Sequence, residues 1–499
     1  MQLTLFPIEP RLSKSKYISG LQCHKRLYLE IHCPDLASPP DAERQAILEA
    51  GTDVGEVARR RFPGGVLVDC GHGNLRRALR RTEELLNDPH VPAIFEATLK
   101  FDNVLVRVDV LARSEADGEG WRLIEVKAST RIKHVHLDDL AIQAHVVRGF
   151  GLRLDGIALI HLNRAYVYGG GKVDLSHLFV EQDLMSEVSS RLAEVPVRLA
   201  SMKAMLMEPS MPSVEPGHHC HAPYVCPFWD HCTKEKDPRW VFYLPGHKRA
   251  FEKLSEQGVN TIDAIPDEFR LSGAQQRMKD NVEWIGPELK AALQAVRYPV
   301  HHLDFEGFMP PMPLFPGTRP YQTLPFQWSN HTEHENGIVH HAQYLCADDR
   351  DPREELALAL LRTLGRDGSI CVYSGYEWRI LMDLAEAIPT LRRQLGALAA
   401  RLWDLLPIVR RHYYHPAFEG SFSIKVILPA LVPSLDYGNL AIRDGGLAAL
   451  QYYRMAFGKV DASEKAHIRA SLLEYCKRDT LALLQIRRVL HAKALEAHP

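Results

Sequence analysis

Two groups of acidic residues in this chain have the types and spacings of divalent-metal ligands. In the first group, Asp109 ends the apolar stretch VRVDV and Glu125 lies in LIEVK, so adjacent strands would bring two carboxylates together. Lys127 follows Glu125 by two residues and would share its face of the sheet. Carboxylate oxygens suit Mg²⁺ or Mn²⁺, which lower the pKa of a bound water and neutralise charge on a phosphate. The pattern predicts phosphodiester hydrolysis, whereas by itself it also fits alternating surface charge.

The second group combines a strand near the middle of the chain with a helix near its end. Asp304 and Glu306 alternate in HHLDFEGF, so both carboxylates share one face of a strand. Tyr475 and Asp479 are four residues apart in LLEYCKRDTLAL, which places them one helical turn apart. Such a tyrosine can orient an attacking water while the aspartate binds metal. Each half of the pattern alone also fits a solvated face.

Three cysteines lie between the two acidic groups and predict a metal centre. Cys220, Cys226 and Cys232 follow one another at intervals of six residues in HHCHAPYVCPFWDHC. Clustered cysteines in a cytosolic chain indicate metal ligation rather than disulfides. Three thiolates need a fourth ligand. Zinc is one possibility, because histidines accompany the cysteines at positions 218, 219, 221 and 231.

The elements that would position the first group form a small α/β core. Strands are expected over IFEATLKFD, NVLVRVDVLARS and WRLIEVKAST because these stretches alternate or are continuously apolar. A helix is expected from Leu137 to Phe150, followed by the strand GIALIHLNRAYVY. Helical spacing is also present from Leu178 to Met207, before prolines and the cysteines.

The second group requires another domain, which opens near Tyr298. Strands are expected at PVHHLDFEGF, FQWSNHTEH and SICVYS, with helices over Arg353–Leu364 and Ala466–Ala492. Residues 236–297 have short helical patterns and are interpreted as a helical connector. We therefore expect an α/β protein with domains at residues 1–235 and 298–499, in line with the usual domain sizes.

Composition favours a soluble globular protein and gives little sign of a nucleic-acid partner. The 499 residues are 46% hydrophobic and 24% charged, and 60 Lys and Arg nearly balance 62 Asp and Glu. Any phosphate-binding surface must therefore be local, for example within Lys14–Arg26. No apolar run approaches the length of about 20 residues that a membrane span needs, and the first ten residues do not resemble a signal peptide. These features predict a cytoplasmic protein without a membrane partner.

The first acidic group resembles the PD-(D/E)XK nuclease superfamily, in its RecB-like branch. Asp109 followed by Glu125-Val126-Lys127 matches the core signature, and Gln143 in LDDLAIQAHVV matches the helical glutamine of that family. The resemblance implies a further metal ligand on an earlier helix, for which Glu56 in GTDVGEVARR is the candidate and Glu96 a weaker one. It implies a restriction-endonuclease-like fold. It also implies that these residues have the catalytic and metal-binding roles of a nuclease site.

RecB-like relatives with an iron–sulfur cluster take one cysteine from before the nuclease core and three from after it. Cys23 in YISGLQCHKRLYLE matches the first, so the resemblance implies a 4Fe–4S cluster held by Cys23, Cys220, Cys226 and Cys232. The cluster would be mainly structural. A zinc ion at the same residues is the alternative.

The second acidic group resembles the DEDD exonucleases of the RNase H-like fold, in the subclass with tyrosine in its last motif. Asp304 and Glu306 match the first motif, and Tyr475 and Asp479 match the third. The middle motif normally supplies an aspartate after an aromatic residue, whereas VYSGYEWRIL offers Glu377. Asp383 and Asp404 are alternatives, and Lys425 in SFSIK is either a phosphate contact or a surface lysine.

Together the two resemblances imply a Mg²⁺- or Mn²⁺-dependent nuclease, with exonuclease activity, that acts on DNA at single-stranded ends or flaps. RNA remains open as a substrate, and both DNA repair and anti-phage defence are compatible roles. One alternative is a nucleic-acid-binding protein in which one or both sites are inactive. Another is a zinc-bearing scaffold for protein interactions.

Overall fold

The computed structural model describes residues 10–39, 42–70, 74–114, 119–246 and 248–497 of the chain. It has the mixed α/β composition that the sequence predicts, with separate sheets in two compact units. The first unit comprises Met1–Glu235 together with Pro310–Tyr321, and the second comprises Lys236–Met309 and Gln322–Pro499. These bounds differ from the expected domains in two respects. The segment 236–297 belongs to the second unit, and a short segment from beyond residue 298 belongs to the first.

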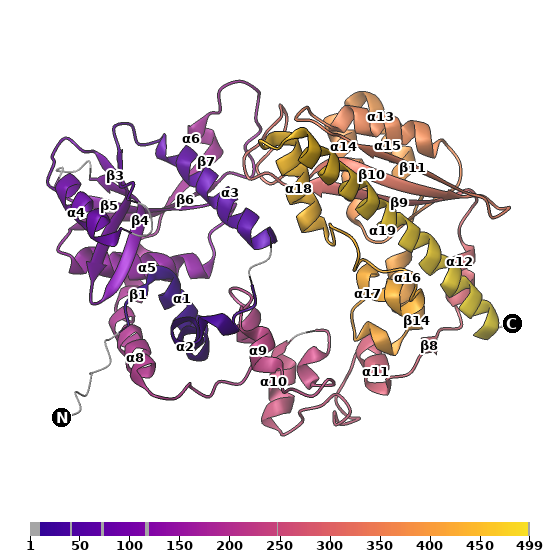
Figure 1. Cartoon of the computed structure of the whole chain (residues 1–499), viewed down its shortest axis with the longest axis horizontal. Coiled ribbons are helices and arrows are strands. Elements are labelled where there is room, and N and C mark those ends of the chain that lie inside the picture. Colours follow the sequence, from indigo (N-terminus) through magenta and orange to yellow (C-terminus); the bar gives the residue numbers. More distant parts are fainter. Residues whose placement is uncertain (1–9, 40–41, 71–73, 115–118, 247, 498–499) are drawn as a thin grey trace. The chain divides into compact units, whose positions relative to one another are not determined.

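One sheet of seven strands forms the centre of the first unit (Figure 1). Its order is β2-β3-β4-β5-β6-β7, with β1 pairing parallel to β4. Neighbouring strands are antiparallel except β2 with β3 and β5 with β6, which are parallel. A parallel pair needs a crossover, and here a helix between β5 and β6 supplies it. The strands are β1 (Leu12–Ser13), β2 (Val66–Leu67), β3 (Ala93–Phe101), β4 (Val104–Arg113), β5 (Trp121–Lys127), β6 (Leu154–Leu162) and β7 (Phe179–Asp183).

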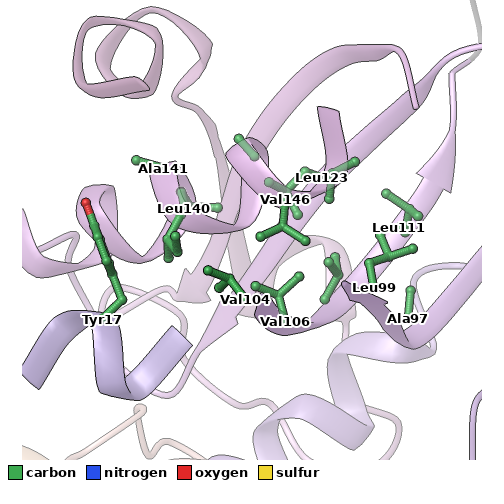
Figure 2. Packing of buried hydrophobic residues seen from close by; sticks show 14 of the residues in the cluster. Tyr17, Ala97, Leu99, Val104, Val106, Leu111, Leu123, Leu140, Ala141 and Val146 are labelled. Carbon is green, nitrogen blue, oxygen red and sulfur yellow. The ribbon is translucent and has the colours of Figure 1, made fainter. Parts of the chain in front are cut away.

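The crossover helix α5 (His134–Gly149) covers one face of this sheet. Its residues Leu140 and Val146 are fully buried against Val104 and Leu123 of the strands, in the cluster that Figure 2 shows. The alternating valines of β4 serve this face because successive side chains of a strand point to opposite sides. On the other face, a second core cluster includes Ile124 and residues of helix α3 (Ala42–Arg59). Glu125 and Asp109 are therefore placed by a sheet that is packed on both faces.

The remaining helices of the first unit lie before, between and after the strands of its sheet. The expected helix from Leu178 is wrong at its start, because residues 179–183 form the edge strand β7, which pairs with β6. Helical spacing in so short a segment is overridden by that pairing. The helices are α1 (Lys14–Gln22), α2 (His24–His32), α4 (Leu75–Leu86), α6 (Leu175–Leu178), α7 (Met185–Leu192), α8 (Val195–Met207) and α9 (Trp229–Thr233), with short 3-10 turns at Pro34–Leu36 and His218–His221.

The segment Pro310–Tyr321 completes the face that α3 covers. Its Tyr321 packs against the second core cluster and donates a hydrogen bond from Oη to the Ala128 carbonyl, at 2.7 Å. The backbone of Tyr168 exchanges hydrogen bonds with Gly317 (2.7 Å) and Thr318 (2.9 Å). Ala128 directly follows Lys127, so this segment supports the end of the strand that bears the first acidic group.

The second unit is built on a sheet of five strands in the order β11-β10-β9-β12-β13 (Figure 1). The first three are antiparallel neighbours, and β12 lies parallel to both β9 and β13. The sequence predicted β9, β10 and β12 but not the edge strands β11 and β13. The strands are β9 (Val300–Phe308), β10 (Leu324–Glu333), β11 (Val339–Leu345), β12 (Ser369–Val372) and β13 (Leu402–Asp404), and a small separate pair joins β8 (Trp284–Ile285) to β14 (Tyr413–Tyr414).

Helices pack on this sheet around Leu303, Phe305 and Trp328, which are almost fully buried. The long last helix α19 contacts β9 and β10, and so carries its polar residues to the strand with Asp304 and Glu306. Tyr413 donates a hydrogen bond to Glu283 at 2.5 Å, which ties the expected connector into this unit. The helices are α10 (Lys248–Glu256), α11 (Gly273–Asp280), α12 (Leu289–Gln294), α13 (Arg353–Leu364), α14 (Tyr376–Ala387), α15 (Arg392–Ala399), α16 (Leu405–His412), α17 (Ile424–Leu431), α18 (Gly445–Phe457) and α19 (Ala462–Ala497), with 3-10 turns at Val241–Tyr243, Pro389–Leu391 and Pro416–Phe418.

Candidate functional site

The first site lies where β4 and β5 run side by side. Their antiparallel register pairs Val110 with Ile124, which places Asp109 directly across from Glu125. The backbone N–H of Val126 donates to Asp109 Oδ2 at 2.8 Å and so orients that carboxylate. The structure thus brings together the two acids that the sequence placed on adjacent strands.

Glu125 is 1% exposed and is surrounded by cationic and amide donors. Lys127 donates from Nζ to Glu125 Oε1 at 2.6 Å, and Lys14 donates to the same oxygen at 2.8 Å. Gln143 donates from Nε2 to the other oxygen, Oε2, at 2.7 Å. Lys127 and Gln143 are therefore in contact with the carboxylate, as the resemblance implied. Lys14 was predicted only as part of a basic surface segment.

Asp139 of α5 is a further member of this site that the sequence reasoning passed over. Its Oδ2 accepts from Lys127 at 2.6 Å, and its Oδ1 lies 3.5 Å from Lys14 Nζ. Asp139 precedes Gln143 by four residues, so both side chains lie on one face of the helix. That spacing was the signal that could have identified it. The neighbouring Asp138 instead pairs with Arg191 at 2.7 Å.

The charges of this site shift the pKa values of its two candidate metal ligands in opposite directions. Burial and the neighbouring Glu125 raise the pKa of Asp109 to about 7. Burial would also raise the pKa of Glu125, but Lys127 and Lys14 outweigh it and hold that pKa well below the usual range. Near neutral pH the site therefore has one firmly ionised carboxylate beside one that is half protonated, and a cation bound between them would favour full ionisation.

The other two candidates of the first site lie on different elements. Glu56 is exposed on α3, and its role as a ligand stays a prediction. Glu96 of β3 forms an ion pair with Arg59 at 2.8 Å. Its backbone is in the left-handed region (φ 56°), a conformation that costs energy in a non-glycine residue.

The second site gathers residues of β9 and α19. Among the described residues, ligand atoms of Asp304, Glu306 and Cys476 all lie within 4.8 Å of one another. The Cys476 thiol donates to Asp304 Oδ2 at 3.6 Å. The sequence predicted the two acids but assigned no role to Cys476.

Asp479 and Tyr475 of α19 complete this site, together with two residues of other elements. Tyr437 donates to Asp479 Oδ1 at 2.5 Å, and the two tyrosine rings lie 6.3 Å apart. Lys425 Nζ lies 5.3 Å from the ring of Tyr475 and 5.9 Å from that of Tyr437. Lys425 thus lies beside the site, and a contact with phosphate stays a prediction. Tyr437 was not predicted, because its loop has no recognisable pattern.

Glu377 is the buried acid of the middle motif, and it lies at the start of α14. It is 3% exposed, and its Oε2 has no hydrogen-bond partner within the described chain. Burial and the negative charge of Asp404 raise the pKa of Glu377 to about 8. Asp404 itself caps α16 through a hydrogen bond from Leu406 N (3.0 Å), and Asp383 is exposed. Glu377 is therefore the acid of this segment that faces the other carboxylates.

The carboxylates of the second site raise one another's pKa. Burial is the largest cause of the raised pKa at both Asp304 and Glu306, and repulsion by Asp479 is the next. Both pKa values therefore lie well above the usual range. Burial raises the pKa of Asp479 to about 6. Hydrogen bonds from Tyr437 and Tyr475 and the charge of Lys425 act in the opposite direction and lower this pKa. Because repulsion and burial raise the pKa values of Asp304 and Glu306 despite nearby cations such as Lys425, added positive charge would stabilise this site.

The four cysteines expected in one centre do come together in the first unit. Cys23 lies between α1 and α2, Cys220 and Cys226 are buried with Phe228, and Cys232 packs against them. Burial, and then the neighbouring thiols, raise the pKa of Cys220 to about 11. His219 Nε2 lies 3.6 Å from Cys220 Sγ. In the described chain the only three potential ligand atoms within 4.8 Å of one another are those at Asp304, so no three of these sulfurs are that close.

Comparison with known proteins gives a match that lies mostly in the second unit. A family model described as a domain of unknown function (DUF2779) matches residues 301–423. This range includes Asp304, Glu306 and Glu377 and ends before Lys425, Tyr475 and Asp479. No curated protein matches the chain. Within the described residues, no helix has both the length and the apolar character needed to cross a membrane.

Proposed function

We propose that the protein is a metal-dependent nuclease with two separate sites that hydrolyse phosphodiester bonds of DNA. The observation that carries this proposal is the first site: two carboxylates on paired strands, with a lysine and a helical glutamine in contact with one of them. The resemblance to RecB-like nucleases supports it at each of these positions. A nuclease of this type acts on ends or flaps of DNA, and RNA is a second substrate to be tested.

In the first site, Asp109 and Glu125 would hold a Mg²⁺ or Mn²⁺ ion. When bound, such an ion supplies an activated water and neutralises the charge of the phosphate. Lys127 is placed by Asp139 and presents its ammonium group beside Glu125, where negative charge develops during hydrolysis. Gln143 holds Glu125 by its second oxygen and thereby keeps the carboxylate plane in one orientation.

In the second site, Asp304, Glu306 and Asp479 would hold the metal, with Glu377 as the fourth acid. Tyr475 and Lys425 are available to contact the substrate phosphate and its attacking water. The strand and helix order, with acids on the first strand and on the last helix, agrees with the resemblance to DEDD exonucleases. The glutamate of the middle motif favours, for this site alone, the alternative of a nucleic-acid-binding site without turnover.

For the cysteine centre, the resemblance to RecB-like nucleases favours an iron–sulfur cluster at Cys23, Cys220, Cys226 and Cys232, and zinc is the alternative. The burial of Cys220 and Cys226, with Cys232 packed against them, supports a thiolate-bound centre at this place. The charges of Cys23, Cys226 and Cys232 all act on Cys220, as expected of four thiols in one group. The cluster would join the helical start of the unit to the segment after its sheet.

End-labelled DNA and RNA substrates test the proposal. Single-stranded, double-stranded and flapped forms are incubated with Mg²⁺ or Mn²⁺ and with wild type, Asp109→Ala, Asp304→Ala and the double variant. We expect each single variant to lose a distinct part of the cleavage and the double variant to lose all of it. Full cleavage by the double variant contradicts the proposed function, and tight binding without cleavage by wild type selects the binding-protein alternative.

A further inference from the structure

Lys14 is held in the first site by the structure around its own helix. It is the first residue of α1, whose start is capped by Ser13, which accepts a hydrogen bond from the Lys16 backbone N–H at 3.3 Å. Strand β1 just before it pairs with β4, so the helix begins beside the strand of Asp109. At the other end, α1 leads directly into Cys23.

Close packing against α8 fixes the position of α1 further. A side chain in place of Gly20 would bring its Cβ within 2.6 Å of the Met202 sulfur, so glycine permits this approach. Tyr17 of the same helix is 1% exposed in the main core cluster. The start of α1, and with it the Cα of Lys14, is therefore set by the fold.

The Lys14 ammonium group closes a ring of alternating charges. Its Nζ lies 2.8 Å from Glu125 and 3.5 Å from Asp139, and Lys127 makes contacts of 2.6 Å with each of the same two acids. Both lysines bind Glu125 through Oε1, and Gln143 binds Oε2. The oxygens that a divalent cation would need on Glu125 are thus already engaged by donors.

The two lysines differ in how firmly they are held. Lys127 has two short contacts and comes from the end of a central strand, whereas Lys14 has one short and one longer contact at a helix end. The two lysine side chains are almost equally exposed, 25% for Lys14 and 26% for Lys127, so the difference lies in their contacts and in the elements that carry them. A cation that approaches Glu125 would therefore displace Lys14 and leave Lys127 with Asp139.

We propose that Lys14 is a positioning residue that competes with the metal ion for Glu125. Its ammonium group lies beside Glu125, where a bound metal ion would place its positive charge. It thereby sets the concentration of divalent cation at which the first site fills. This inference rests on the proposed function, because it requires Asp109 and Glu125 to be metal ligands. It concerns a residue outside the matched D…ExK…Q pattern.

The test is a calorimetric titration of the full, cluster-containing chain with Mn²⁺. The background variant carries Asp304→Asn, Glu306→Gln, Glu377→Gln and Asp479→Asn, which removes all four acids of the second site and so leaves the first site to bind the ion. Lys14→Met should lower the Kd for Mn²⁺ roughly tenfold. This factor corresponds to the smaller end of the pKa change that one charge within about 4–6 Å causes in a neighbouring carboxyl group. Lys14→Arg, which keeps the charge, should return the Kd close to that of the background.

Lys16→Met is the matched control, because it removes the same charge two residues further along the same helix. We expect its Kd for Mn²⁺ to equal that of the background. A Kd for Lys14→Met that is unchanged or higher, with the visible absorption of the cluster and the melting temperature retained, overturns the inference while the nuclease proposal stands. Absence of Mn²⁺ binding in every variant, including the background, overturns the metal site and the inference together.

Discussion

Substitution of Glu377 by glutamine should stabilise the metal-free protein, and increasingly so as the pH rises. Glu377 is 3% exposed, with one oxygen unpartnered among the described residues, and burial raises its pKa from 4.5 to about 8. The folded protein therefore holds this proton more tightly than the unfolded chain does. Ionisation opposes folding once the pH exceeds the unfolded pKa, and the penalty grows until the pH reaches the folded pKa. Glutamine cannot ionise and avoids the penalty.

The magnitude follows from the width of that pH window. One pKa unit corresponds to about 1.4 kcal/mol. The variant should therefore exceed wild type in free energy of unfolding by about 1 kcal/mol at pH 5.5 and by about 4 kcal/mol at pH 7.5. The difference should be near zero at pH 4.5, where Glu377 of the unfolded chain is itself half protonated.

Urea denaturation of metal-depleted protein, followed by tryptophan fluorescence at pH 5.5, 6.5 and 7.5, measures this difference. Glu386→Gln is the control, because Glu386 is exposed on the same helix α14. The free energy of unfolding of the control should differ from that of wild type by the same small amount at each pH. A difference for Glu377→Gln that is flat between pH 5.5 and 7.5, or that favours wild type at the higher pH, would refute the electrostatic reasoning for the second site.

Three further changes test other parts of the molecule. In protein without second-site activity, Lys127→Met should lower the cleavage rate by about 10²–10³, the usual loss on removing one group that stabilises developing charge, as a gel assay would measure. Cys23→Ser should abolish bound iron and the visible absorption of the cluster, as metal analysis and spectroscopy would measure. Tyr321→Phe should lower the free energy of unfolding of the first unit by about 1 kcal/mol, the usual contribution of one hydrogen bond, as urea denaturation would measure.

Each of these three changes has a control in the chain. Lys133→Met removes a cation from the N-cap of α5 and should leave cleavage unchanged. Cys33→Ser alters a cysteine that packs against the buried Cys220 and Cys226 but is not one of the predicted ligands. This variant should keep its iron. Tyr224→Phe alters a tyrosine that is 47% exposed and should keep the stability. Equal effects in a variant and its control would contradict the corresponding assignment.

The strands that carry the acids were predictable because their signal is local. The valines of β4 alternate along the strand and the apolar residues of β5 form a nearly continuous buried run, and both patterns lie within ten residues. Edge strands β7, β11 and β13 were missed because they are largely exposed or only half-buried, so they have no clear apolar pattern and their conformation depends on the strand beside them. The assignment of 310–321 to the first unit has no local signal at all, since it depends on contacts of Tyr321 with residues far along the chain.

By itself, the sequence determined which acidic residues are candidates for metal binding and on which elements they lie, because D…ExK on strands and Y-x-x-x-D on a helix are spacings within one element or two neighbours. Only the tertiary structure decided which donors surround those acids. Lys14 reaches Glu125 across 111 residues, and Tyr437 reaches Asp479 across 42. The physical reason is that burial and charge act through space. A carboxylate's pKa depends on all the groups packed around it, and chain order does not reveal which groups those are.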